Sequence, residues 1–325
     1  MILTITPNPA LDISGEVDDI APNEKNYVSQ EQRHPGGNAI NTARIIASLK
    51  VPVLATGFLG GAFGDELASL LDQEQVPHQF VRIAQSTRVN VTVSNCKTHQ
   101  QTRLSFPGPT IHPDEVECLY KTVDAQVEAK LLNIGGSFPP GFTIDHIRKL
   151  LHIGANKGKG AVVDVPSKHL KEIIAMQPIL VKPNLTEFRE LVGHPVATRD
   201  EVLNEARKLT QRVPFICVSS VEGGVVLVTA RSAWFAKGPQ VKVKSSVGAG
   251  DAMVGAILTE LYKARIFNNE SARNVSDEII DSMLRSGLSA ALATIITPGT
   301  ILGDAEGIKE FLPRIEVKKI PYSPS

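Results

Sequence analysis

The stretch SSVGAGDAMVGA, residues 245–256, places glycine and alanine residues directly before an aspartate, and an apolar run of helical character follows. If a helix begins near Asp251, the turn into it is formed by Gly248, Ala249 and Gly250. Their backbone N–H groups then have no acceptor within the helix, so they and the helix dipole favour an anion. A carboxylate at this corner can accept the proton of an attacking hydroxyl. The pattern indicates phosphoryl transfer, and it is also typical of an aspartate that only caps its helix.

Polar residues near two other apolar segments are suited to binding a polyol. Asp12 follows the first expected strand at its carboxyl end, where open α/β sheets bind ligands, and a carboxylate can hold two neighbouring hydroxyls. Gly36 and Gly37 precede an expected helix and admit a ligand close to the backbone. Asn41, one turn later, faces the same space. Each of these residues also has a purely structural interpretation. Asp12 could lie in a turn, Gly36 and Gly37 could mark an ordinary helix start, and Asn41 could be an amide on the surface.

The segment KPNLTE, residues 182–187, combines a cation, an amide and a carboxylate after another expected strand. Asn184 and Glu187 share one face if a helix begins at residue 184. A glutamate near a triphosphate is repelled unless Mg²⁺ lies between them, directly or through water. The same pair also fits a capping box, and the two roles can coexist. Lys182 lies either near nucleotide phosphates or only at the strand end.

Three cations lie in segments with alternating or polar character. Arg88 and Arg103 fall on the alternating segments 88–94 and 102–106, and Lys25 lies in an earlier polar segment. Cations at these positions could grip a phosphate already present on a sugar. Charges that protect an exposed sheet edge from aggregation are the alternative.

Short apolar runs alternate with amphipathic segments along the chain, which predicts a mostly parallel sheet with helices on both faces. The expected strands are 2–6, 52–57, 130–134, 161–165, 179–181, 215–218 and 225–229. The expected helices are 38–49, 65–73, 114–129, 143–156, 186–191, 199–211, 251–263, 276–296 and 306–312.

Two segments do not fit this alternation. Segments about 12–35 and 86–108 have one polar face and few helices nearby, as in a small antiparallel β lid. No repeat or low-complexity linker divides the chain. We therefore expect a single domain, 1–325, with the lid segments inserted.

Composition and missing motifs exclude several classes of protein. The 325 residues include 34 basic and 34 acidic ones, which argues against nonspecific nucleic-acid binding. No apolar run is long enough for a membrane span, the N-terminus does not resemble a signal peptide, and the three cysteines match no zinc or redox pattern. A cytoplasmic location is expected. Walker, dinucleotide-binding and G-x-S-x-G motifs are absent.

Taken together, the motifs resemble those of the ribokinase-like carbohydrate kinases, the PfkB family. SSVGAGD (245–251) is similar to the C-terminal signature of that family. The resemblance runs in order from residue 1 to about 300, through NPALD (8–12), PGGNAIN (35–41), GFLGGAFGDE (57–66), STRVNVTV (86–93), GSFPPG (136–141) and KPNLTE (182–187). It is greatest to the phosphohexose branch, which comprises 1-phosphofructokinase, tagatose-6-phosphate kinase and the minor bacterial 6-phosphofructokinase.

The resemblance implies a ribokinase-like fold and transfer of phosphate from ATP, with Mg²⁺, to a ketohexose phosphate. Fructose 1-phosphate is the first expectation, followed by fructose 6-phosphate and tagatose 6-phosphate. It implies roles for Asp251 as base, Asp12 in sugar binding and Arg88 in phosphate binding. It also assigns Ser137 to the substrate and Ser219 and Gly224 to a nucleotide loop. A homodimer formed through the lid is implied, and a requirement for K⁺ is left open.

Two motifs depart from the family pattern. Asn38 and Ala39 stand where 1-phosphofructokinases and tagatose-6-phosphate kinases usually have Lys-Gly. Val221 replaces the first glycine of Ser/Thr-x-Gly-x-x-Gly at 219–224, and a β-branched residue cannot easily adopt positive φ, so we expect a locally different loop. Two other functions therefore remain open, a kinase of an unphosphorylated sugar or nucleoside and a catalytically weak regulator that binds a phosphosugar.

Overall fold

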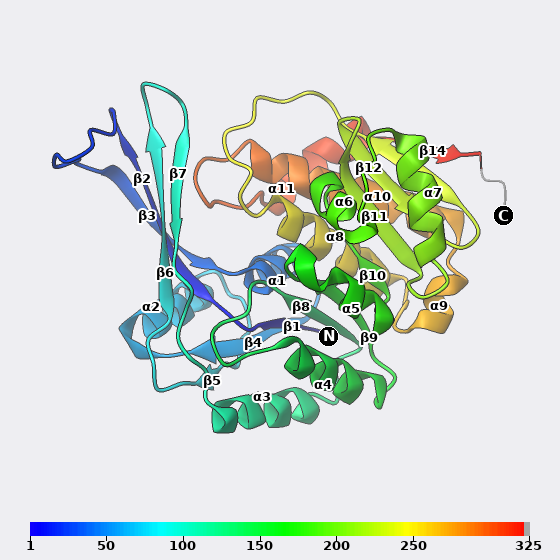
Figure 1. The fold of residues 1–325 in the computed structure, drawn as a ribbon, viewed down its shortest axis with the longest axis horizontal. Helices are drawn as coiled ribbons and strands as arrows, with labels where there is room; N and C mark the ends of the chain where they lie inside the picture. The colour runs from blue at the N-terminus through cyan, green and yellow to red at the C-terminus, as the bar shows by residue number, and fades with distance from the viewer. Residues whose placement is uncertain (322–325) are drawn as a thin grey trace.

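The computed structural model describes residues 1–321, which fold around a ten-stranded sheet (Figure 1). The strands, in their order across the sheet, are β14 (Glu316–Ile320), β13 (Ala233–Lys237), β12 (Gly224–Val228), β11 (Phe215–Val221), β10 (Leu180–Val181), β9 (Gly160–Asp164), β8 (Leu131–Gly135), β1 (Ile2–Thr6), β4 (Val53–Leu59) and β5 (Val81–Arg82). Strands β11 to β5 are parallel, and β12, β13 and β14 add in antiparallel pairs.

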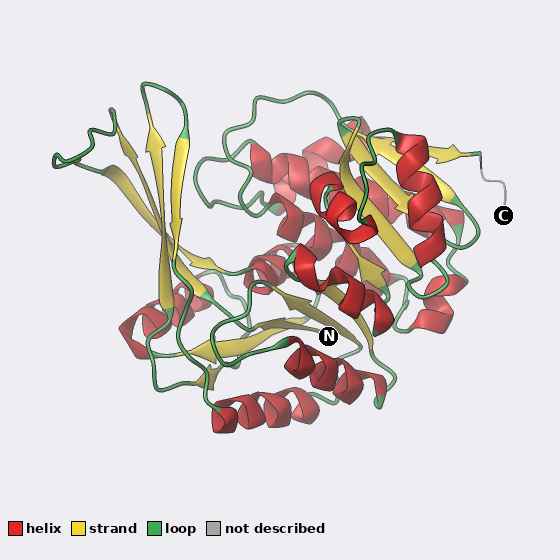
Figure 2. Ribbon diagram, in the orientation of Figure 1, coloured by secondary structure: helices red, strands yellow, loops and turns green. Residues whose placement is uncertain are grey.

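Helices cover both faces of this sheet (Figure 2). One face carries α1 (Asn38–Ser48), α2 (Gly61–Gln73), α8 (Ala249–Lys263), α9 (Asn269–Arg273), α10 (Asp277–Ile295) and α11 (Ala305–Phe311). The other carries α3 (Pro113–Ala125), α4 (Ile144–Ala155), α5 (Leu170–Ala175), α6 (Leu185–Val192) and α7 (Arg199–Leu209).

The continuous apolar strands are explained by burial on both faces of the sheet. In β8, Leu131 packs into one core and its neighbour Leu132 packs into the other. Successive side chains of a strand point to opposite faces, so a strand between two helical layers must be apolar throughout. This confirms the predicted mostly parallel sheet with helices on both faces.

A second, four-stranded sheet forms the lid, which projects from the main sheet in Figures 1 and 2. Its order is β3 (Ser29–Gly36), β2 (Ala10–Val17), β6 (Arg88–Asn95) and β7 (Gln101–Ser105). The outer pairs β3–β2 and β6–β7 are antiparallel hairpins, whereas β2 and β6 run parallel. The two segments singled out in the sequence therefore come together as one sheet.

The position of Asp12 differs from the expectation. The first strand ends at Thr6, and Asp12 lies within lid strand β2 rather than in a turn after β1. The prolines at positions 7 and 9 separate the two strands, which explains why the apolar pattern looked like one strand and a turn. Asp12 is paired with His34 on one side and Asn90 on the other.

The sequence pattern missed short or polar elements. Strands β5, β13 and β14 and helices α5 and α9 were not predicted. β14, EVKKI, is an edge strand whose charged residues hide its β character. Within residues 1–321, no helix is long and apolar enough to cross a membrane.

Candidate active site

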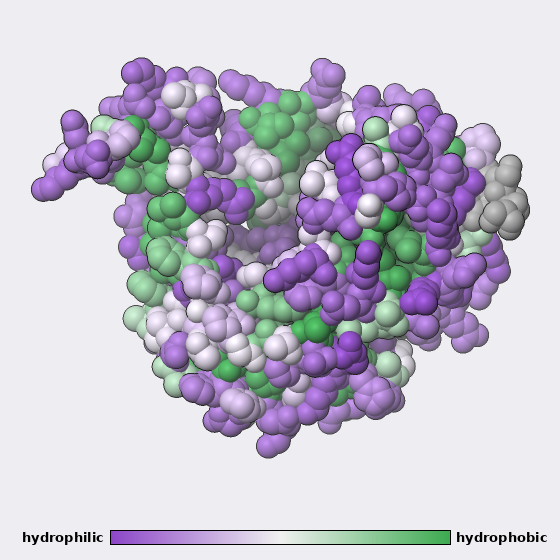
Figure 3. Space-filling view, viewed as in Figure 1, coloured by the Kyte–Doolittle hydropathy of each residue, from purple (hydrophilic) through white to green (hydrophobic). Residues whose placement is uncertain are grey.

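The candidate site lies in the hollow between the lid and the helical body, seen in Figure 3. Helix α8 begins here at Ala249, two residues earlier than predicted, after Gly248 in the left-handed region at φ 76°. The amide of Ala252 donates to the Gly248 carbonyl at 2.8 Å. The amides of residues 249–251 precede this bond, so they have no acceptor within the helix and are available to an anion.

Helix α1 holds the Asp251 carboxylate in place. Asn41 Nδ2 donates to Asp251 Oδ2 at 2.8 Å, and Thr42 Oγ1 donates to the backbone carbonyl of Asp251 at 3.2 Å. Asp251 is only 8% exposed. Because Asn41 occupies Oδ2, the second oxygen, Oδ1, is left for an incoming hydroxyl.

The surroundings of Asp251 raise its pKa to about 7. Burial is the main cause, and the negative charge of Asp164 acts in the same direction. The hydrogen bond from Asn41 and the charge of Lys182 oppose the increase, while Asp12 adds to it. A carboxylate with a pKa near neutrality is suited to accept a proton during catalysis.

Lys182 adds a buried cation beside the start of α8. A side chain at Gly250 would place its Cβ 3.2 Å from Lys182 Nζ, so the ammonium lies against the first helical turn. Burial disfavours its charge, but Asp164, Cys217, Asp251 and Glu187 together leave the pKa of Lys182 raised. A charged lysine next to the positive end of a helix is electrostatically unfavourable unless an anion lies between them. The arrangement fits a phosphate.

Asp12 faces the same hollow from the lid. Asn90 Nδ2 donates to Asp12 Oδ1 at 2.8 Å, and a Cβ on Gly36 would lie 2.4 Å from the Asp12 carboxyl carbon. Burial raises the pKa of Asp12, against the hydrogen bond from Asn90 and the charges of Arg88 and Arg103. Gly36 therefore makes room for the Asp12 carboxylate, whereas the sequence predicted room for a ligand at this glycine.

Arg88 and Ser137 lie together at one end of the site. Arg88 Nη1 donates to the Phe106 carbonyl at 2.7 Å and Nη2 donates to the Asn8 carbonyl at 3.1 Å. Its Nε is buried and has no hydrogen-bond partner within the described residues. Asn8 Nδ2 in turn donates to Ser137 Oγ at 3.0 Å. Arg88 and Ser137 line a cavity of about 720 Å³, together with Lys168.

The pair Asn184 and Glu187 forms the capping box of α6. Asn184 Oδ1 accepts from the Glu187 amide at 3.0 Å, and Glu187 Oε2 accepts from the Asn184 amide at 2.8 Å. The structural alternative for these residues is therefore confirmed. Glu187 Oε1 is outside this pairing, so the cap does not prevent a second role.

The acidic residues around Lys182 are compatible with Mg²⁺. Within the described chain, no three His, Cys, Asp or Glu side chains form a ready-made metal site. Mg²⁺ bound to a nucleotide usually needs only one or two carboxylates, with phosphate and water completing its shell. Asp164 and Glu187 both act on Lys182, and their carboxylates are of the kind that would hold such an ion.

Some predicted residues are not brought to this hollow. Lys25 is exposed in the loop between β2 and β3, at the outer end of the lid. Arg103, although exposed on β7, lies on the same lid face as Asp12, and its charge opposes the raised pKa of Asp12. Ser219 pairs with Asn184 in a short β-bridge. Gly224 lies in β12, where a Cβ would meet the Ala236 carbonyl oxygen at 2.4 Å, so strand packing explains this glycine.

The loop at Val221 places its positive φ angles on the neighbours of Val221. The side chain of Val221 is buried in the core, and the positive φ angles fall on Ser220, Glu222 and Gly223 instead. Glu222 and Gly223 form a two-residue turn between the paired residues Val221 and Gly224. A valine is therefore accommodated without backbone strain at its own position.

Sequence reasoning missed three polar residues of the site, Asn8, Asn90 and Asp164. Asp164 ends the apolar strand β9, so the rule that selected a carboxylate after the first strand could have found it. Asn90 sits between valines in RVNV and looks like an ordinary polar-face residue of a lid strand. Asn8 lies between Pro7 and Pro9, and an asparagine between two prolines is most simply interpreted as a turn residue.

Comparison with known proteins gives consistent matches over nearly the whole chain. The model of a family described as pfkB family carbohydrate kinase matches residues 8–304. The chain is 27% identical over 321 residues to the 1-phosphofructokinase of Bacillus subtilis, covering 98% of this chain and 100% of the relative. It is 33% identical over 314 residues to the ATP-dependent 6-phosphofructokinase isozyme 2 of Mycobacterium tuberculosis, covering 95% and 88% respectively.

Solved structures agree with these matches. The crystal structure of phosphofructokinase-2 from Escherichia coli in complex with substrates and products is similar with a TM-score of 0.86 and 31% identity, covering 96% of this chain and 98% of that one. Other structures of the same E. coli protein are a complex with potassium and a tetrameric inhibited form.

The raised pKa of Asp251 predicts how its replacement affects stability. Below pH 4 the carboxyl is protonated in both the folded and the unfolded chain. Between pH 4 and 7 the unfolded chain ionises first, so the native protein loses stability as pH rises. Asp251→Asn does not ionise and should be more stable than the wild type at pH 8, by roughly 1–4 kcal/mol at about 1.4 kcal/mol per pKa unit. Urea unfolding of both proteins at pH 4 and pH 8 measures this.

The control is Asp18→Asn, which changes an exposed carboxylate directly after lid strand β2. Its stability relative to the wild type should be the same at both pH values. An Asp251→Asn protein whose relative stability also stays constant with pH would contradict the raised pKa.

Proposed function

Because the chain belongs to the pfkB family of carbohydrate kinases, we propose that it is an ATP-dependent kinase that phosphorylates a ketohexose phosphate. The observation that carries this proposal is the placement of Asp251. It is a buried carboxylate with a pKa near 7 at the start of α8, between the lid residue Asp12 and the buried cation Lys182. One corner thus combines a proton acceptor with an anion site.

The proposed reaction is a single phosphoryl transfer. A hydroxyl oxygen of the sugar forms a bond to the γ-phosphorus of ATP, while the bond from that phosphorus to the β–γ bridging oxygen breaks and ADP leaves. The hydroxyl proton passes to Asp251 Oδ1, because Oδ2 is engaged by Asn41. The amides at the start of α8 and the Lys182 ammonium stabilise the charge on the moving group.

The lid and the main sheet would act together on the sugar. We assign the sugar hydroxyls to Asp12 and Asn41, with close approach at Gly36 and Gly37. We assign the phosphate already on the sugar to Arg88, whose buried Nε has no partner within the described residues, with Ser137 and Arg103 nearby. Closure of the lid excludes water, which would otherwise compete as acceptor. We therefore treat the lid as part of one kinase domain.

The nucleotide would lie on the other side of Asp251. Lys182 and the α8 amides face its phosphates, and we keep Asn184, Ser219 and Gly224 as the wall of the nucleotide side by family resemblance. Mg²⁺ held through Asp164 and Glu187 would neutralise phosphate charge when bound. ATP as donor fits the expected cytoplasmic location.

The outer face of the lid supports the proposal of a homodimer. Ile13, Val91 and Leu104 form one cross-strand row on the face opposite Asp12. Leu104 is 55% exposed, and Tyr27 and Val28 nearer the lid tip are also exposed. A sheet face with apolar residues in contact with solvent is typical of a protein interface.

The test of the proposed function is an ADP-release assay with Mg²⁺, with and without K⁺, across several acceptors. These are fructose 1-phosphate, fructose 6-phosphate, tagatose 6-phosphate and the two parent sugars. We expect kcat/KM for at least one ketohexose phosphate to exceed that of its parent sugar by roughly 100-fold or more, because the half-buried Arg88 recognises the phosphate. Asp251→Asn should lower kcat by roughly 10²–10⁴-fold, as loss of a general base does.

Equal turnover of a parent sugar would instead identify a kinase of unphosphorylated sugars. Binding of a sugar phosphate in a thermal-shift experiment, without any ADP release, would identify a regulator. Near-normal turnover by Asp251→Asn would remove the base assignment.

Arg88→Ala tests recognition of the sugar phosphate. We expect KM for the ketohexose phosphate to rise roughly 10–1000-fold, because a charge-assisted contact is lost, while KM for ATP changes less than about 3-fold. Steady-state kinetics with each substrate varied in turn measure both values. Arg82→Ala, which removes an exposed arginine paired with Asp65, is the control and should change neither. Equal losses for both substrates would mean that Arg88 mainly supports the Phe106 and Asn8 carbonyls.

Leu104→Glu tests the dimer. A buried charge without a partner should weaken a lid interface by at least about 10-fold in Kd. Sedimentation velocity should then show a monomer at concentrations where the wild type is dimeric. Val127→Glu, which places the same charge at a 65% exposed valine outside the lid, should leave the dimer intact. A dimer unaffected by Leu104→Glu would place the interface elsewhere.

A further inference from the structure

Arg44, on α1, connects the lid and α2 with the residue that holds Asp251. Its Nε and Nη2 donate to the two carboxylate oxygens of Glu74 at 2.6 and 2.7 Å. Its Nη1 donates to the Pro35 carbonyl of lid strand β3 at 3.2 Å and to Asn41 Oδ1 at 3.3 Å. The Arg44 side chain is 9% exposed. The guanidinium is therefore fixed from three sides.

The amide of Asn41 lies between two groups with opposite hydrogen-bonding capacity. A guanidinium can only donate and an ionised carboxylate can only accept. Asn41 therefore satisfies both neighbours in one orientation only, with Oδ1 toward Arg44 and Nδ2 toward Asp251 Oδ2. If the amide turned over, its oxygen would face the carboxylate and its NH₂ would face the guanidinium, and both contacts would be repulsive.

We propose that Arg44 is a positioning residue for phosphoryl transfer: clamped by Glu74, it fixes the amide of Asn41 so that Asp251 Oδ2 is occupied and Oδ1 remains free for the substrate proton. This inference rests on the proposed function, since it concerns the base of that reaction. Arg44 does not touch the reacting atoms and acts through Asn41.

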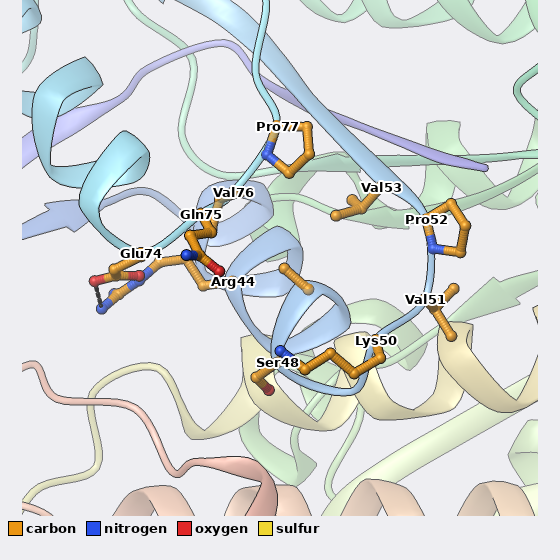
Figure 4. Close-up of a pocket in the computed structure, with 11 residues that line it drawn as sticks. Arg44, Ser48, Lys50, Val51, Pro52, Val53, Glu74, Gln75, Val76 and Pro77 are labelled. Carbon is orange, nitrogen blue, oxygen red and sulfur yellow. Dashed lines mark hydrogen bonds and ion pairs between the residues drawn. The ribbon is translucent and has the colours of Figure 1, made fainter.

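The outer end of this chain of contacts opens on a groove on the body of the protein. The groove has a volume of about 620 Å³ and is lined by Arg44 and Glu74 together with residues from 47–53 and 75–77. Figure 4 shows the Arg44 and Glu74 side chains meeting at one side of this groove. The Glu74 side chain is 34% exposed, so Glu74 can be replaced without leaving a buried cavity. It is therefore a second place at which the chain of contacts can be cut.

A simpler role for Arg44 would be to tie the lid to the body. Another ion pair separates the two roles, because Arg33 on lid strand β3 pairs with Glu66 of α2 at 3.1 Å. This pair also links the lid to α2, but it makes no contact with Asn41. Arg33→Met and Glu66→Ala are therefore matched controls for Arg44→Met and Glu74→Ala.

The charge of Arg44 must also be separated from its positioning role. Asp251 faces Asp164 from the end of β9, Lys182 after β10, Asp12 from β2 and the donor Asn41 from α1, and the bond from Asn41 lowers its pKa. Loss of that bond should raise the pKa of Asp251, and so would loss of the positive charge of Arg44. Removal of the negative charge of Glu74 acts in the opposite direction. A higher pKa of Asp251 in Glu74→Ala can therefore come only from an Asn41 amide that is held less firmly.

The experiment measures kcat, KM and the pH dependence of kcat/KM for the wild type and the four variants, with the sugar phosphate that serves best as acceptor. For Arg44→Met we expect kcat to fall roughly 10–100-fold, with KM for ATP changed less than about 3-fold. The acidic limb of kcat/KM should move to higher pH by about 0.5–1 unit in Arg44→Met and by a smaller amount in Glu74→Ala. In both control variants the acidic limb of kcat/KM should stay at the wild-type pH.

An acidic limb that stays in place in Glu74→Ala, or moves to lower pH, would overturn the proposal, as would an equal shift in Arg33→Met. Glu74→Ala decides the question if Arg44→Met does not fold. If the wild type has no kinase activity, the proposed function fails separately, and the pKa of Asp251 is then read by carboxyl-carbon NMR titration of the wild type and Glu74→Ala. An unchanged pKa in that titration would overturn the positioning role on its own.

Discussion

One hydrogen bond, from the Asn41 amide to the Asp251 carboxylate, joins the two helices on which the candidate active site is built. The close approach of α1 and α8 makes this bond possible. A Cβ on Gly255 would lie 2.9 Å from the Thr42 carbonyl oxygen, so only glycine allows α8 to lie this near α1. The helix start, its free amides and the carboxylate are thereby held as one rigid unit. Preorganised donors of this kind need no rearrangement when charge develops.

The charges of the site are arranged so that a bound phosphate and its metal ion would offset the repulsion among them. Asp12, Asp164 and Asp251 surround the hollow, and two of them raise the pKa of the third. On the other side, Lys182 lies at the positive end of α8. The three aspartates repel one another, and Lys182 is repelled by the positive end of α8. Both groupings are unfavourable alone, because like charges are brought together in a poorly solvated space. The protein accepts this cost at the position where a phosphoryl group and its metal would restore the balance.

Much of this arrangement could be predicted from the sequence, because its signals are local. The strand-end motifs and the Gly-Ala-Gly-Asp turn identify residues whose neighbours along the chain already define the geometry. Arg44 could not be recognised in this way, since its importance depends on Glu74, Pro35 and Asn41, which only the fold brings around it. Asn41 and Asp251 are also far apart, and only the packing of α1 on α8 brings them together. The pairing of β2 with β6 is likewise a long-range feature that no local pattern encodes.

That parallel pairing has a consequence for how the lid is made. Its two hairpins are separated by the segment that forms α1, β4, α2 and β5, so the pairing of β2 with β6 closes a long loop at a cost in chain entropy. An isolated two-stranded hairpin is marginally stable in water, and the sheet becomes stable only with its third and fourth strands. The four-stranded lid therefore depends on the folded body, which holds the two hairpins beside each other. Loss of structure in α1, β4 or α2 would therefore also destabilise the lid, although no residue of the lid had changed.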